Sequence, residues 1–127
     1  MPIEPGLSGV AHLTVTVAET AEAVRSGDVP VLATPLVVAL CEEATVDAVE
    51  GHLYAGQTTV GIRVEIDHLA ATAVGSSVTA RALVTGVEGR TVVFRVTVQE
   101  KDAEVARGVV RRAVVDRDRF LRTIDGR

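Results

Sequence analysis

Two titratable side chains, Glu42 and His68, stand where the surrounding pattern predicts apolar residues. The segment TVGIRVEIDHLAATAVG places an apolar residue at every second position from Val60 to Ile66, and His68 takes the next position on that face. Glu42 lies in a helical pattern, ATPLVVALCEEATVDAVEG, on a face that otherwise predicts core. A glutamate and a histidine placed in this way suit general acid–base chemistry near neutral pH.

Each of these residues also has a purely structural interpretation, which the sequence leaves open. A lone histidine on an apolar face is often a hydrogen-bonded core residue, and a glutamate at the rim of a core can extend its carboxylate to water. Burying the Glu42 carboxylate is costly unless a hydrogen-bond donor meets it. Of the other histidines, His12 is expected at the surface and His52 in a loop.

Thr34 precedes Pro35 where this helix should begin, and we expect it to be the N-cap. Capping alone would explain the threonine. A helix N-terminus also offers free N–H groups that stabilise a developing oxyanion, and the hydroxyl would add a donor. Glu42 follows eight residues later, about 12 Å along the axis, so the two side chains should not touch. A site using both must span substrate or water, or combine two subunits; we expect a homodimer with active sites at or near its interface.

The remaining pattern predicts one long helix, closed near Gly51, and a run of antiparallel strands. Strands are expected at 57–68, 77–87, 91–100 and 105–115, after an earlier strand within 9–17. A closing helical turn is expected in DRDRFLRTI, with Phe120 and Leu121 packing back onto the sheet. This order is typical of an α+β, hotdog-like architecture, in which a wrapped sheet would bury the helix fully.

Composition and charge narrow the classes of protein. The 127 residues, 47% hydrophobic and 2% aromatic, fit one domain over 1–127 with an aliphatic core. A net charge of -4 argues against a nucleic-acid partner. Cys41 alone forms no internal disulfide and is expected to pack, and no metal or cofactor motif occurs. The N-terminal residues do not resemble a signal peptide and no apolar run suggests a membrane span, so we expect a cytoplasmic protein.

The spacing of Thr34, Glu42 and His68 resembles that of hotdog-fold thioesterases of the fluoroacetyl-CoA thioesterase type. The matching segments are LATPLVVALCEEA and GIRVEIDHLAATAVGS, and VRRAVVDRDRF resembles the family's last strand. The resemblance implies that these three residues are catalytic, that Gly61 and Arg112 lie on the substrate side, and that a homodimer hydrolyses an acyl-CoA without metal.

The segment RSGDVPVLA before the helix departs from the family pattern, because the fluoroacetyl-CoA-specific enzymes are expected to close a small acyl pocket with aromatic residues there. The sequence therefore predicts an acyl-CoA thioesterase without a stated preference for a fluorinated acyl group. A non-catalytic acyl-CoA binding or sensing module on the same fold is the alternative. Hydration of an enoyl-CoA is a third hypothesis. That reaction would need an Asp–His pair, and Asp67, although next to His68 in sequence, should point to the opposite face. Arg112 or another surface arginine could hold the CoA phosphates, or Arg112 could simply lie on a solvated strand edge.

Overall fold

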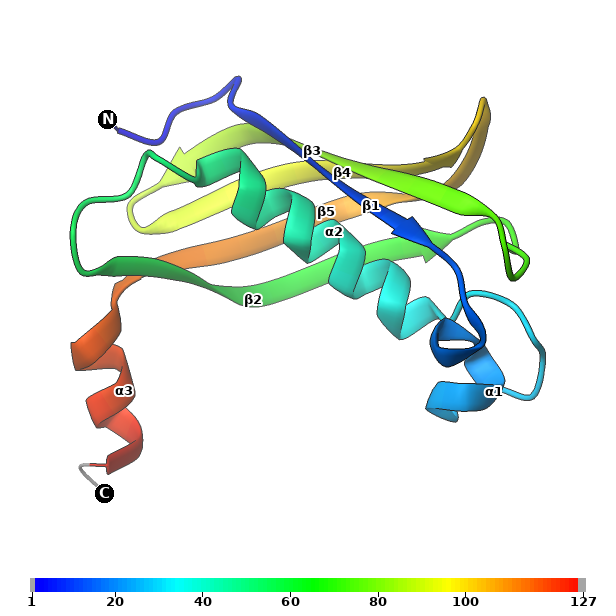
Figure 1. Cartoon of the computed structure of the whole chain (residues 1–127). Coiled ribbons are helices and arrows are strands. Elements are labelled where there is room, and N and C mark those ends of the chain that lie inside the picture. The colour runs from blue at the N-terminus through cyan, green and yellow to red at the C-terminus, as the bar shows by residue number, and fades with distance from the viewer. Residues whose placement is uncertain (1, 126–127) are drawn as a thin grey trace.

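A five-stranded antiparallel sheet curls around one long helix in the computed structural model, which describes residues 2–125 (Figure 1). The strands are β1 (Ser8–Thr14), β2 (Gln57–His68), β3 (Ser77–Glu88), β4 (Thr91–Glu100) and β5 (Ala103–Asp116), in the spatial order β1-β3-β4-β5-β2. The long helix is α2 (Thr34–Val49). The short elements are η1 (Val17–Glu19), α1 (Ala21–Val24) and α3 (Arg117–Asp125). The predicted α+β arrangement is confirmed.

The N-cap of helix α2 lies one residue before the predicted cap. Ala33 is the N-cap and makes no side-chain capping bond, so Thr34 is the first helical residue and Pro35 the second. The prediction that Thr34 caps the helix is therefore wrong, and its hydroxyl is free for another partner. The helix ends at Val49, close to the predicted stop.

The core lies between α2 and the concave face of the sheet. The helix contributes a face of small and branched residues: Val37, Leu40, Cys41, Ala44, Thr45, Ala48 and Val49. Strand β1 crosses this face closely, because a Cβ on Gly9 would overlap the backbone of Ala44 and Ala48. Across the sheet, Phe94 is the largest fully buried side chain. Burial of this aliphatic surface is the main stabilising contribution.

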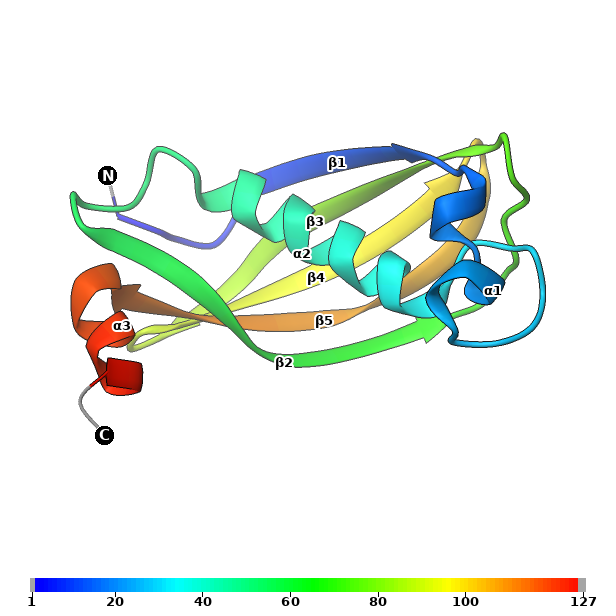
Figure 2. The ribbon, with the colours of Figure 1, turned by 60° about the horizontal axis from the view of Figure 1, so that its bottom comes forward.

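The sheet does not bury α2 on every side, contrary to the sequence-based expectation. Figure 2 shows one side of α2 open between the edge strands β1 and β2. Val46 on this helix keeps 47% of its surface exposed. Because β2 pairs only with β5, its other edge also carries unpaired backbone groups.

A β-bulge in β2 breaks the predicted alternation. Gly61 pairs with Arg112 but Arg63 pairs with Arg111, so Ile62 is an extra residue. The extra residue reverses the alternation, so that the residues before the bulge present the opposite face from the one predicted. Gly61 therefore lies on the helix side of the sheet in place of Val60. Ile62, predicted in the core, is 54% exposed.

Helix α3 follows the end of β5, beside the start of β2, and points away from the sheet instead of folding onto it (Figure 1). Phe120 and Leu121 are 39% and 45% exposed, so the prediction that they pack back is wrong.

Candidate active site

Thr34 and His68 meet at one end of the fold. Helix α2 starts at Thr34 and strand β2, running in the opposite sense beneath it, ends at His68 (Figure 1). The Thr34 hydroxyl lies 2.7 Å from His68 Nδ1. His68 Nε2 is buried and has no hydrogen-bond partner among the described residues. The pairing at Nδ1 fixes the ring and leaves Nε2 as the nitrogen available for a proton transfer.

The N-terminus of α2 offers fewer free donors than the sequence suggested. The Ala33 N–H donates to Glu19 O at 2.9 Å, and the Leu36 N–H donates to Ala33 O at 3.0 Å. Pro35 has no N–H. The Thr34 N–H, beside the Thr34 hydroxyl, is the remaining donor of the first turn, at the positive end of the helix dipole.

Both residues line a cavity of about 340 Å³. Its other walls are the connector between α1 and α2 and the segment after β2. The apolar lining includes Val29, Val31, Leu32, Leu69 and Ala71, and the polar lining adds Ser26 and Asp28. A cavity that combines apolar walls with a few convergent polar groups is typical of a small-molecule site.

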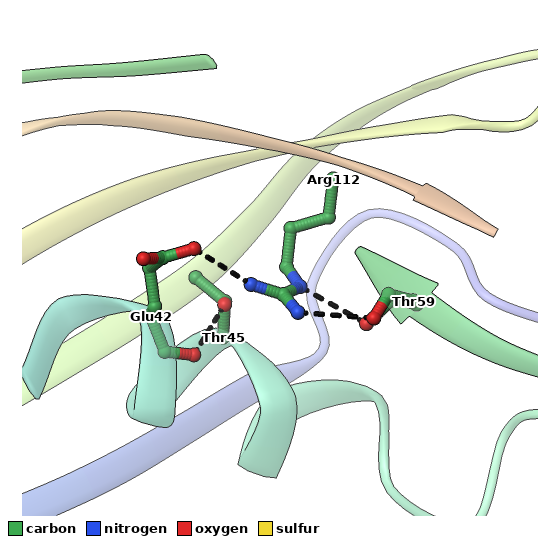
Figure 3. Close-up of polar contacts among 4 residues, drawn as sticks. All are labelled: Glu42, Thr45, Thr59 and Arg112. Atoms are coloured by element: carbon green, nitrogen blue, oxygen red, sulfur yellow. Dashed lines mark hydrogen bonds and ion pairs between the residues drawn. The ribbon is translucent and has the colours of Figure 1, made fainter. Parts of the chain in front are cut away.

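Glu42 makes a separate constellation with Arg112 (Figure 3). Arg112 Nη1 donates to Glu42 Oε2 at 3.0 Å, Nε donates to the Thr59 hydroxyl at 2.9 Å, and Nη2 donates to Thr59 O at 3.1 Å. Arg112 is 7% exposed, and desolvation by burial lowers its pKa, an effect that the charge and hydrogen bond of Glu42 oppose. The hydrogen-bond donor expected for Glu42 is therefore an arginine from β5.

Arg112 is consequently not on a solvated strand edge, so that prediction is wrong, and a role of this residue toward the CoA phosphates stays a prediction. Its guanidinium is occupied by Glu42 and Thr59. The cause is register: Arg112 pairs with Gly61 on the helix-facing side of the sheet, whereas Arg111 faces away.

Gly61 makes room for the Glu42 carboxylate. A Cβ built at this position would overlap Glu42 Oε2 and would lie 3.5 Å from Arg112 Nη1. Any larger residue would therefore push the carboxylate away from the strand. One packed unit is thus formed by Gly61, Glu42 and Arg112. The sequence analysis named all three as candidate site residues, but it missed Thr59.

Glu42 and His68 do not touch in this chain. The Glu42 carboxylate binds Arg112, and His68 binds Thr34. The interpretation of Glu42 and His68 as a directly paired acid and base is therefore not supported within one subunit. The separation of Thr34 and Glu42 by two turns of helix is as expected. Asp67 is exposed on the other face of the sheet, where it lies opposite Arg107 in the pairing of β2 with β5. It therefore does not complete an Asp–His pair with His68.

Cys41 is a packing residue, as predicted. Its side chain is fully buried, and burial, with a smaller contribution from the Glu42 charge, raises the pKa of its thiol to about 12. A thiol that stays protonated is a poor nucleophile.

Within residues 2–125, no group of three or more His, Cys, Asp or Glu side chains is arranged to hold a metal ion. None of the described helices is both long and apolar enough to cross a membrane.

Comparison with known proteins gives a consistent result. A family model described as "Fluoroacetyl-CoA-specific thioesterase" matches residues 15–118. A fluoroacetyl-CoA thioesterase from Streptantibioticus cattleyicolor is 36% identical over 90 residues, which are 71% of this chain and 65% of that protein. The match thus spans less than two thirds of the length of this curated relative.

Solved structures extend the likeness to the whole fold. The structure of the fluoroacetyl-CoA thioesterase FlK has a TM-score of 0.92 at 26% identity, covering 100% of this chain and 98% of the other. A thioesterase superfamily member from Thermus thermophilus has a TM-score of 0.90 at 27% identity, covering 98% and 92%. A hot-dog-like protein from Thermanaerovibrio acidaminovorans has a TM-score of 0.88 at 26% identity, covering 96% and 90%. The predicted hotdog fold is confirmed.

Proposed function

The chain belongs to the fluoroacetyl-CoA-specific thioesterase family, and from this premise we propose that it hydrolyses a small or medium acyl-CoA thioester to the free acid and CoA. The observation that carries the proposal is the Thr34–His68 pair, 2.7 Å apart, in the wall of a cavity at the N-terminus of α2. A hydroxyl, an N–H group and an imidazole with one free nitrogen suit acyl transfer to water.

In this proposal the thioester carbonyl lies beside Thr34. The Thr34 N–H and hydroxyl donate to the carbonyl oxygen as it gains negative charge, and the dipole of α2 adds to this stabilisation. When the C–S bond breaks, the sulfur leaves as a thiolate and takes a proton from His68 Nε2. This fits the tautomer in which His68 Nδ1–H donates to the Thr34 oxygen, because the single hydroxyl proton of Thr34 is then free for the carbonyl oxygen. Nε2 takes up a proton from water and passes it to the sulfur, so that the imidazole is neutral again at the end of the step.

Glu42 supplies either the nucleophile or the base. In the first case its carboxylate attacks the carbonyl to give an anhydride, which water then hydrolyses; in the second it removes a proton from the attacking water. Arg112 and Gly61 hold this carboxylate in place, which is the substrate-side role we assign to them. Because Glu42 and Thr34 of one chain lie about 12 Å apart along the axis, a Glu42 carboxylate attacks a carbonyl beside Thr34 only if a second subunit supplies it. In the base role, a chain of waters could also relay the proton.

A homodimer is part of the proposal. Strand β2 is a sheet edge with unpaired backbone groups, and Ile62 and Val64 on it are 54% and 37% exposed. Val46, on the open side of α2, is 47% exposed. Pairing of β2 with β2 of a second copy would satisfy the backbone groups and cover this apolar surface. No cofactor enters the reaction, one domain over 1–127 performs it, and we expect it in the cytoplasm.

The experiment is a thiol-release assay on purified protein with short, branched, aromatic and halogenated acyl-CoAs, the fluoroacetyl ester among them. The proposal expects release from at least one ester. One observation favours a non-catalytic acyl-CoA binding module: Glu42 is held by Arg112, away from His68. Tight binding of non-hydrolysable thioether analogues with no thiol release from any ester would support that module and contradict the enzyme.

A further inference from the structure

We infer that Asp28 makes the Thr34–His68 cavity select against acyl groups that end in a carboxylate, an inference that rests on the proposed thioesterase function. Asp28 lies in the connector between α1 and α2 and lines the cavity that Thr34 and His68 also line. No part of the sequence-based site included this connector residue.

The ionisable side chains of the cavity wall determine its charge. The residues that line it are Ala21, Ser26, Gly27, Asp28, Val29, Val31, Leu32, Thr34, His68, Leu69, Ala70 and Ala71. They include one carboxylate and neither lysine nor arginine. A second anion in this cavity would therefore meet a like charge without a compensating cation.

The Asp28 carboxylate is available to a ligand in the cavity. Among the hydrogen bonds and ion pairs of the described residues, none uses the Asp28 side chain, and the residue is exposed. Arg112 could not compensate for it, because its guanidinium is occupied by Glu42 and Thr59. The negative charge of Asp28 therefore acts on whatever enters the cavity.

The acyl chain of a bound thioester would lie along the wall that contains Asp28. If Thr34 and His68 flank the thioester carbonyl, the carbons attached to that carbonyl extend along the remaining wall. This wall is formed by the connector with Asp28 and Val29 and by the segment Leu69–Ala71. It offers apolar contacts to a neutral chain and a like charge to a dicarboxylic one. The cavity thus accepts neutral acyl groups in preference to acyl groups such as succinyl or malonyl.

Butyryl-CoA and succinyl-CoA provide a matched pair, because they differ by a terminal methyl against a terminal carboxylate. The wild-type protein should have the higher kcat/KM for butyryl-CoA. Asp28→Asn should raise the succinyl-to-butyryl ratio of kcat/KM by about threefold, because solvent screens an exposed carboxylate, and Asp28→Lys should raise it further. Glu22→Gln removes the same charge from the exposed face of α1, outside the cavity wall, and should leave the ratio unchanged.

An unchanged ratio in Asp28→Asn and Asp28→Lys would overturn the inference. An equal rise of kcat/KM for both esters would also overturn it, because Asp28 would then act on the CoA phosphates common to both. Dissociation constants of the thioether analogues of the two esters test the same preference without hydrolysis. If no ester releases thiol, the proposed function fails, and these binding constants still confirm or contradict the role of Asp28.

Discussion

Arg112 on β5 donates to the Glu42 carboxylate on α2 at 3.0 Å and holds Thr59 on β2 with its other two nitrogens. One buried guanidinium therefore ties the central helix to the two strands at the open edge of the sheet (Figure 3). The Glu42 carboxylate is therefore held by contacts with β5 and β2.

Replacing Arg112 should destabilise the protein. Arg112→Ala leaves Glu42 and the Thr59 carbonyl without their donor, and we expect a loss of about 2 kcal/mol in the free energy of unfolding, since the Glu42 side chain keeps some access to water. Urea denaturation followed by circular dichroism measures this. Arg111→Ala, on the other face of the same strand, is the control and should change the free energy by less than about 0.5 kcal/mol. Equal effects of the two variants would contradict the assigned contacts.

Adding one methyl group at Gly61 should displace Glu42. In Gly61→Ala the new Cβ would overlap Glu42 Oε2, so the carboxylate must move, and kcat should fall by about tenfold or more. Gly86→Ala, at an irregular position in β3 with nothing within 4 Å of its Cβ, is the matched control. Thiol-release kinetics on the two variants compare them, and a Gly61→Ala protein as active as Gly86→Ala would rule out the close packing as a functional feature.

These two sites also show how far the sequence reaches. Periodicity and helix signals located α2, the strands to within about three residues at each end, and the elements that carry Glu42 and His68, because those depend on local pattern. The contact between Glu42 and Arg112 joins residues 70 positions apart, and it depends on a strand register that one sequence does not reveal. Gly61 beside a strand bulge was the one available signal, since an isolated glycine in a strand often marks a bulge or a close approach. The apolar Ile62 concealed that bulge by continuing the alternation.

A charge on the open edge strand should prevent dimer formation. Ile62→Lys places an ammonium group on the exposed edge of β2, where we propose that a second copy pairs. The mass in solution, measured by light scattering after size exclusion, should fall toward the 13.3 kDa of one chain. Val10→Lys, on the opposite edge strand β1, is the control and should stay dimeric. The idea fails if the wild type is already monomeric or if both variants remain dimers.

The Cys41 thiol should resist alkylation until the protein unfolds. Burial holds its pKa at about 12, above the ordinary value of 9.0, so the folded state keeps the thiol neutral. In the unfolded chain the thiol ionises at a lower pH than in the folded protein. Its contribution to the free energy of unfolding is therefore fully present below the unfolded-state pKa and is lost as the pH rises from about 9 toward about 12. Iodoacetamide labelling followed by mass spectrometry should be slow at pH 8 in buffer and fast in denaturing urea. Rapid labelling of the folded protein at pH 8 would show that the thiol is accessible.

The most direct measurement is thiol release from the best acyl-CoA by the wild type, Glu42→Gln and His68→Asn, with the affinity for its thioether analogue measured in parallel. We expect kcat to fall by about a hundredfold or more in each variant, while both variants still bind the analogue. Wild-type turnover in both variants would contradict the roles assigned to Glu42 and His68.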